Sequence, residues 1–266
     1  MLTDRNYWAT YRDEIVAWSG KLPPPAKLGM ERVFEFVRHI LDAAEREQIM
    51  RLIFVPAPST ARKETVLTWL EFMRGRFERE GLLALFPFGI PHKSLGGHFR
   101  QPARLAYYQG ERIVEEDIDD VGNLEKTVVI ARGGDPEGIR YTEPIVLGGG
   151  ARDEEGEGPG RLPTRELPIY LSLSTDIWFP RVIGLDLEDR GGLSRDWRHP
   201  ARGRDGLMDN SALAARHTPR LNRFIEILRG AILELGGTWD KPDVDPSYQP
   251  MVHGGGILLD YPAASA

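Results

Sequence analysis

Histidine and carboxylate side chains are the groups in this sequence that can bind a metal ion or transfer a proton. His92 and His98 lie six residues apart in a loop-like segment, and His253 precedes three glycines. Imidazoles at this spacing can share one metal ion if a third ligand joins them from elsewhere. Asp176 follows a predicted strand and can act as a general base. One interpretation is therefore a metal-assisted hydrolase with these histidines as ligands and this aspartate as its base.

The motif content of the chain does not favour that interpretation. No HExxH or HxH pair is present, and the remaining histidines (39, 199 and 217) are isolated. The glycine triplets 148–150 and 254–256 match neither GxxxxGK[ST] nor GxGxxG, and GxSxG is absent. The lack of cysteine excludes disulfides, thiolate catalysis and cysteine-bound metals. We therefore expect no cofactor, and we expect the histidines to be polar loop residues.

An acidic cluster is the strongest feature that folding alone does not explain. Its members are Glu115, Glu116, Asp117, Asp119 and Asp120. Residues 104–160 hold 14 acidic and 6 basic side chains, a net charge of −8, whereas the whole chain carries −6. A solvated loop is the commonest explanation for such a run of like charges. A docking surface for a basic protein comes second, and a divalent metal site is a further alternative. The spacing does not match an EF-hand calcium loop.

A second candidate for partner binding is Trp197. It lies in the polar, arginine-rich stretch 184–206, where an aromatic side chain is not needed for a core. Tryptophan is enriched at the centres of protein interfaces. We therefore add Trp197 to the predicted partner-binding residues.

The composition excludes several classes of protein. Hydrophobic residues make up 41% of the chain, which is typical of a folded globular protein. An acidic middle segment argues against binding nucleic acid, because phosphate contacts need concentrated Lys and Arg. No apolar run approaches the roughly 20 residues of a membrane span, and the first residues do not resemble a signal peptide. Arginine supplies 28 of the 34 basic residues, which is typical of GC-rich bacterial genomes, so we expect a bacterial cytoplasmic protein.

Hydrophobic periodicity predicts a helical layer at the N-terminus. The three helices that we expect run from Thr3 or Asp4 to Trp18, from Glu31 to about Arg51, and over Ala61–Glu80. Together they occupy residues 1–81. They pack either on the sheet that follows or as a subdomain of their own.

Alternation of apolar and polar residues predicts a mostly antiparallel sheet in the middle of the chain. A hairpin about Gly110 joins Arg104–Gln109 to Arg112–Glu116. Ile139–Leu147 is expected at a sheet edge because it contains Pro144. The glycine-rich acidic segment 148–160 is expected to be a flexible loop. The other predicted strands are Lys126–Ala131, Leu167–Ser174 and Gly256–Tyr261.

The clearest single element is an amphipathic helix at residues 219–235. Thr218 is expected to cap it, with Pro219 at its first position, where a missing N–H costs nothing. Its apolar stripe needs an apolar partner, and the best one is the segment Leu167–Phe179. Apolar residues of the stripe are Leu221, Phe224, Ile225, Leu228, Ile232 and Leu235.

These elements predict one α+β domain over residues 1–266, with a subdivision into 1–81 and 82–266 as an alternative. The long helix is expected to pack on the central sheet. The favoured function is a non-enzymatic protein that docks a basic partner through the acidic cluster, as an inhibitor or an immunity-type protein docks a toxin. The metal-assisted hydrolase and a subunit of a larger assembly remain as alternatives.

Overall fold

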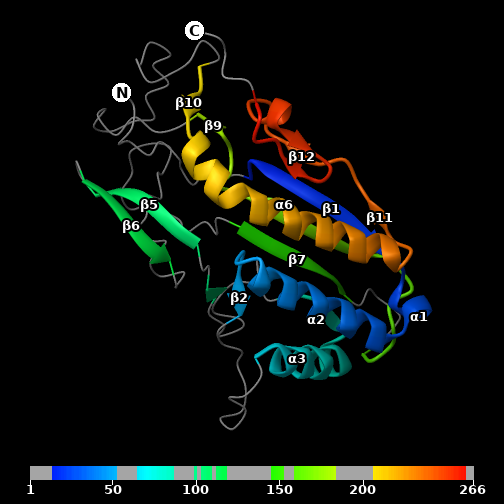
Figure 1. Cartoon of the computed structure of the whole chain (residues 1–266). Helices are drawn as coiled ribbons and strands as arrows, with labels where there is room; N and C mark the ends of the chain where they lie inside the picture. Colours follow the sequence, from blue (N-terminus) through cyan, green and yellow to red (C-terminus); the bar gives the residue numbers. More distant parts are fainter. Residues whose placement is uncertain are drawn as a thin grey trace, which may run out of the picture.

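The computed structural model describes residues 14–52, 65–86, 99–100, 103–109, 112–118, 145–152, 159–183 and 206–261. Within these ranges the fold is α+β, as expected: an antiparallel sheet is covered on one face by helices (Figure 1). The predicted strand Lys126–Ala131 lies outside the described residues.

The central sheet has the strand order β11-β1-β8-β7-β3, and β12 also pairs with β1. Every pairing in it is antiparallel. The strands span Val16–Leu22 (β1), Leu82–Ala84 (β3), Ile145–Arg152 (β7), Leu167–Leu173 (β8), Thr238–Trp239 (β11) and Asp243–Val244 (β12).

Four two-stranded sheets accompany the central one among the described strands. The pairs are Arg51–Leu52 (β2) with Phe99–Arg100 (β4), Ala103–Gln109 (β5) with Arg112–Ile118 (β6), Arg181–Val182 (β9) with Met208–Asp209 (β10), and Val252–His253 (β13) with Gly256–Ile257 (β14). The β5–β6 pair confirms the hairpin expected on either side of Gly110. A short 3-10 helix, η2, spans Gln249–Met251.

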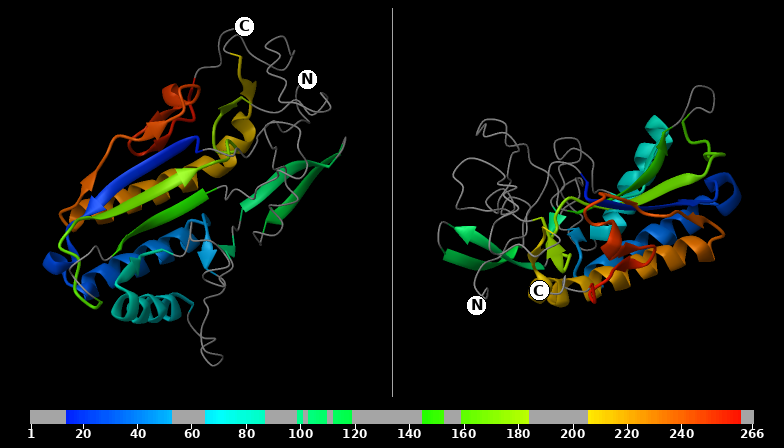
Figure 2. Two further views of the ribbon diagram at one scale, coloured as in Figure 1. Left: turned by 180° about the vertical axis from the view of Figure 1, so that it is seen from behind. Right: turned by 90° about the horizontal axis from the view of Figure 1, so that it is seen from above.

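The α-helices are Pro25–Leu28 (α1), Met30–Arg46 (α2), Thr65–Glu80 (α3) and Ser211–Glu234 (α6). Helices α2 and α6 lie side by side on one face of the sheet, and α3 packs against α2 on the side away from α6 (Figures 1 and 2). The predicted stripe of α6 is buried from Leu221 to Ile232, and so are the alternate residues of β8 from Leu167 to Leu173. These two apolar surfaces form the core, which confirms the long helix as a partner of the sheet.

The predicted first helix is wrong in its last part, because residues 16–22 form the strand β1. Val16, Trp18 and Leu22 are buried at alternate positions of this strand. Strand β1 lies near the middle of the sheet, where all seven residues pair with β8. Residues 16–22 are therefore part of the sheet and do not belong to a purely helical layer.

The segment at the glycine triplet also differs from its prediction. Residues 145–152 form β7, which lies between β8 and β3 and is not an edge strand. The triplet 148–150 is extended strand, so the flexible loop predicted from residue 148 does not begin there. Glycine is needed because β7 touches its neighbours closely. A Cβ at Gly148 would come within 2.1 Å of the Tyr170 ring on β8.

Helix α6 begins eight residues earlier than predicted and continues through Pro219. Thr218 is therefore inside the helix and is not its N-cap. Its hydroxyl donates a hydrogen bond to the carbonyl of Trp178, and Leu213 and Ala214 are buried in the additional turns. We infer that these contacts offset the cost of a proline in a helix interior, which is about 3 kcal/mol.

Replacing Pro219 with alanine is expected to stabilise the fold by about 2 kcal/mol. Alanine restores an N–H that can donate to the carbonyl of Ala215, and it removes the clash of the proline ring with that carbonyl. The matched control is Pro250→Ala, because Pro250 is exposed in the first turn of η2, where proline is tolerated. Urea denaturation of both variants checks the prediction. Equal free energies of unfolding for wild type and Pro219→Ala would contradict it.

Candidate functional site

Three members of the acidic cluster lie on strand β6. In the hairpin register, Glu115 is opposite Ala106, Glu116 is opposite Leu105, and Asp117 is opposite Arg104. Because successive strand residues alternate between faces, positions 115 and 117 share one face of the hairpin and position 116 belongs to the other. Residues 115–117 of the acidic cluster therefore belong to a strand and not to a loop, and their positions are divided between the two faces of the hairpin. Asp119, Asp120 and Trp197 lie outside the described residues.

Of the three histidines proposed as metal ligands, the structure describes His253. His92 and His98 lie outside the described residues, and His253 is an exposed residue of β13. The Nδ1 atom of His253 accepts a hydrogen bond from the Gly255 N–H at 3.1 Å, and its carbonyl accepts one from the Trp18 indole at 3.0 Å. Among the described residues, no three His, Asp or Glu side chains are grouped so that they could hold a metal ion.

Asp176 is fully buried, with 0% of its surface exposed. Its Oδ2 atom accepts a hydrogen bond from the Tyr248 hydroxyl at 2.9 Å, and that hydroxyl accepts one from the Ile183 N–H at 3.1 Å. This arrangement ties the C-terminal segment to the turn that follows β8. A general base must reach the proton that it removes. The structure gives Asp176 a buried structural contact, and its role as a base stays a prediction.

The turn after β8 is also held by Asn210, which precedes α6. Its Nδ2 atom donates to the carbonyls of Ile177 at 3.1 Å and Phe179 at 2.9 Å. Arg181 is buried as well and donates to the carbonyl of Leu207 at 2.9 Å. Hydrogen bonds from side chains therefore satisfy the irregular backbone of this turn and fix Trp178, which lies between the two residues that Asn210 contacts.

Trp178 meets two polar side chains of α6, and we call His217, Arg220 and Trp178 the Arg220 cluster. The Trp178 and His217 rings contact edge to face with centroids 6.0 Å apart, and the Arg220 guanidinium lies 5.6 Å from the centroid of the Trp178 ring. An Arg220 Nη2 atom lies 2.7 Å from His217 Nδ1. His217 and Arg220 are neighbours because residues three apart share a face of a helix.

Burial changes the protonation behaviour of both α6 residues. Burial, together with the smaller effect of the charges of Arg220 and Arg216, lowers the pKa of His217 to about 4. Burial also lowers the pKa of Arg220 to about 10. At neutral pH, Arg220 is therefore charged and His217 is neutral. Because Arg220 can only donate, His217 Nδ1 accepts, and the proton of the neutral imidazole is on Nε2.

The Arg220 cluster contains three buried N–H groups that have no hydrogen-bond acceptor among the residues that the structure describes. They are Trp178 Nε1, His217 Nε2 and Arg220 Nε. Trp178 and His217 are each 2% exposed. A buried donor without an acceptor costs about 1 to 3 kcal/mol, so three in one place are unusual in a folded protein.

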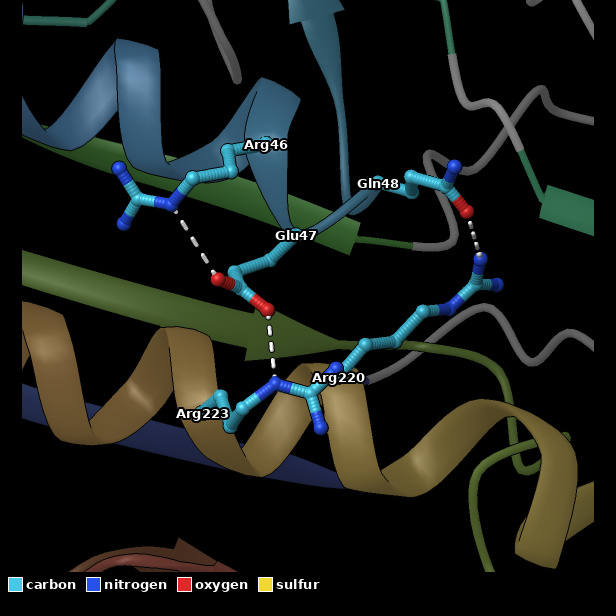
Figure 3. A network of polar contacts seen from close by, with 5 residues as sticks. All are labelled: Arg46, Glu47, Gln48, Arg220 and Arg223. Carbon is cyan, nitrogen blue, oxygen red and sulfur yellow. Dashed lines mark hydrogen bonds and ion pairs between the residues drawn. The ribbon is translucent and has the colours of Figure 1, made fainter.

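The end of α2 borders the cluster (Figure 3). Arg220 Nη1 lies 3.5 Å from Gln48 Oε1, whereas the neighbouring Arg223 forms an ion pair with Glu47 at 2.8 Å. Glu47 also meets Arg46 at 3.4 Å, and the hydrogen bond from Arg223 is the main cause of its lowered pKa. Arg220 and Arg223 of α6 thus differ, because Arg223 has a carboxylate partner and Arg220 contacts neutral groups.

The Arg220 cluster was not predicted from the sequence, because Thr218 was assigned as an N-cap. That assignment placed His217 outside the helix and made it an isolated residue. A continuous helix would have put His217 and Arg220 on one face. Trp178 could not have been added, because it approaches from a turn some forty residues away in sequence.

No protein-family model, no curated protein sequence and no solved structure matches this chain. Across the ranges that the structure describes, none of the helices has the length and apolar character needed to cross a membrane.

Proposed function

We propose that the protein is a non-enzymatic bacterial protein that docks a basic partner through its acidic segment, in the manner of an inhibitor or immunity-type protein. The observation that supports this most is the net charge of −8 on residues 104–160. A cytoplasmic location is part of the proposal, since a chain without cysteine needs no oxidising compartment.

The β5–β6 hairpin gives part of this charge a defined arrangement. Positions 115 and 117 lie on one face of β6, and two residues along a strand are about 7 Å apart. A strand holds such positions at fixed spacing, so two basic side chains of a partner can meet them together. Charges arranged this way speed association and make it dependent on salt.

Charge reversal on one face of the hairpin tests the proposal. The variant Glu115→Lys/Asp117→Lys is compared with Glu226→Lys/Glu234→Lys, which changes two exposed carboxylates of α6 and alters the net charge equally. Proteins captured from a bacterial extract by the immobilised chain are identified by mass spectrometry, and their association rates are then measured at low and high salt. We expect the hairpin variant to lose a basic protein that wild type and control retain, with association slower by about tenfold or more.

The separate variant Glu116→Lys shows which face of the hairpin docks. If position 116 faces away from the partner, this variant binds nearly as well as wild type. The proposal is wrong if the hairpin variant and the α6 variant capture the same proteins at the same rates, or if binding to wild type does not weaken with salt.

A further inference from the structure

We propose that the Arg220 cluster is a binding site for an oxyanion, either phosphate or a carboxylate group. This inference is independent of the docking function, because it concerns α6 and the turn after β8 and not the acidic hairpin. Among the described residues, the groups that contact the Arg220 guanidinium are Gln48, His217 and the Trp178 ring, and all three are neutral at physiological pH.

The hydrogen-bonding groups of the cluster all require an acceptor. Trp178 Nε1, His217 Nε2 and Arg220 Nε are buried donors, and the one acceptor nitrogen of His217 is already used by Arg220. Indole and guanidinium groups cannot accept hydrogen bonds at all. The site therefore offers donors and one positive charge.

This chemistry selects among small ligands. A cation would be repelled by Arg220. A water molecule could accept two of the N–H groups, but its own hydrogens would need acceptors that these three side chains do not have. An oxyanion accepts several hydrogen bonds through its charged oxygens, and its charge strengthens each contact with the guanidinium. Phosphate and carboxylate share this property.

Gln48 lies on the exposed side of the Arg220 cluster. It is exposed, Arg220 is half-buried, and the other two members of the cluster are enclosed. Gln48 has a φ of 56°, in the left-handed region, directly after the end of α2. Its N–H donates to the Glu45 carbonyl and the N–H of Ile49 donates to that of Ala44, which is the Schellman arrangement where glycine is usual. Gln48 instead supplies a side chain whose oxygen faces Arg220.

An anion titration followed by NMR tests the site. The indole N–H signals of the ¹⁵N-labelled protein are recorded while phosphate replaces chloride at constant ionic strength. The chain has six tryptophans, and the Trp178→Phe variant identifies the signal of Trp178. We expect a saturable downfield shift of this signal with phosphate, and a parallel titration with acetate shows whether a carboxylate serves equally well.

Two arginine variants complete the experiment. Arg220→Gln is expected to weaken anion binding by about tenfold or more, because it removes the charge and the Nε–H donor. Arg223→Gln is the matched control, since it removes an arginine from the next part of the same helix that already pairs with Glu47, and it should bind the anion as wild type does. The proposal is overturned if neither phosphate nor acetate gives a saturable shift in wild type, a result that does not depend on any variant folding. It is also overturned if Arg220→Gln binds as tightly as wild type.

Discussion

A Gly150→Ala variant is expected to lose about 3 to 5 kcal/mol of folding free energy, which is enough to unfold many domains of ordinary stability. Gly150 has a φ of 145°, which L-residues rarely adopt. A Cβ on it would lie 2.0 Å from the carbonyl oxygen of Leu83 on β3. That oxygen belongs to backbone paired with β7, so it cannot move aside without breaking the pairing of β3 with β7.

Gly230→Ala is the matched control for this prediction. Gly230 lies inside α6, and a Cβ on it would meet nothing within 4 Å. Alanine there should stabilise the protein by about 0.5 to 1 kcal/mol through its better helix propensity. Chemical denaturation of both variants gives the two free energies. A Gly150→Ala protein as stable as wild type would mean that β3 and β7 are not as close as the structure shows.

Asn210→Asp is expected to cost about 3 to 5 kcal/mol at neutral pH, although the two side chains have nearly the same shape. The amide of Asn210 donates to two buried carbonyls, those of Ile177 and Phe179. A carboxylate would leave both carbonyls without a donor and would place a buried negative charge beside them. The turn that carries Trp178 would lose the two hydrogen bonds that Asn210 donates to it.

The pH dependence of this variant distinguishes charge from packing. Burial beside two carbonyl oxygens should raise the pKa of the introduced carboxyl in the folded state above its unfolded value of about 3.9. The folded state then holds the proton more tightly, so the deficit relative to wild type shrinks as the pH falls through the folded pKa. Asn210→Ala, which carries no charge, should show a deficit that does not change in this way. If Asn210→Asp behaves like Asn210→Ala at every pH, the charge is not the cause.

The elements that could be predicted from the sequence are those with a long and unambiguous period. The stripe on α6 and the alternation on β8 each bury the expected residues. The β5–β6 hairpin follows from two alternating runs around Gly110. In each case the local sequence pattern agrees with the pairing or burial in the fold. These elements could therefore be predicted without knowing their contacts with residues far away in the sequence.

Strand β1 could not be distinguished from a helix by its pattern. Trp18 and Leu22 are four residues apart, and residues at that spacing share a face in a helix and in a strand alike. What decides is the pairing of β1 with β8, which lies about 150 residues later. The strand at the glycine triplet was missed for a related reason. Glycine can make a segment flexible, but at Gly148 it provides room for the Tyr170 side chain. These two roles cannot be distinguished from the sequence alone.

The candidate site was the least predictable part. Its α6 residues were hidden by one wrong helix boundary, and Trp178 joins them only through the tertiary fold. Motif searches look for metal ligands and nucleophiles. A buried donor without an acceptor can be recognised only in a three-dimensional structure, where its neighbouring atoms are known. The acidic segment, in contrast, is evident from composition alone, and its docking role remains a prediction.

The position of β1 has a consequence for how the chain folds during synthesis. Val16 pairs with Leu173, and Gly20 pairs with Trp239, so the first strand leaves the ribosome long before either neighbour exists. Until then both of its edges and its apolar residues lack their final partners. Contacts so distant in sequence slow folding and lengthen the time during which a chain can aggregate. We therefore expect a nascent chain of this protein to aggregate less when its N-terminal segment is protected until the last quarter of the sequence has been made.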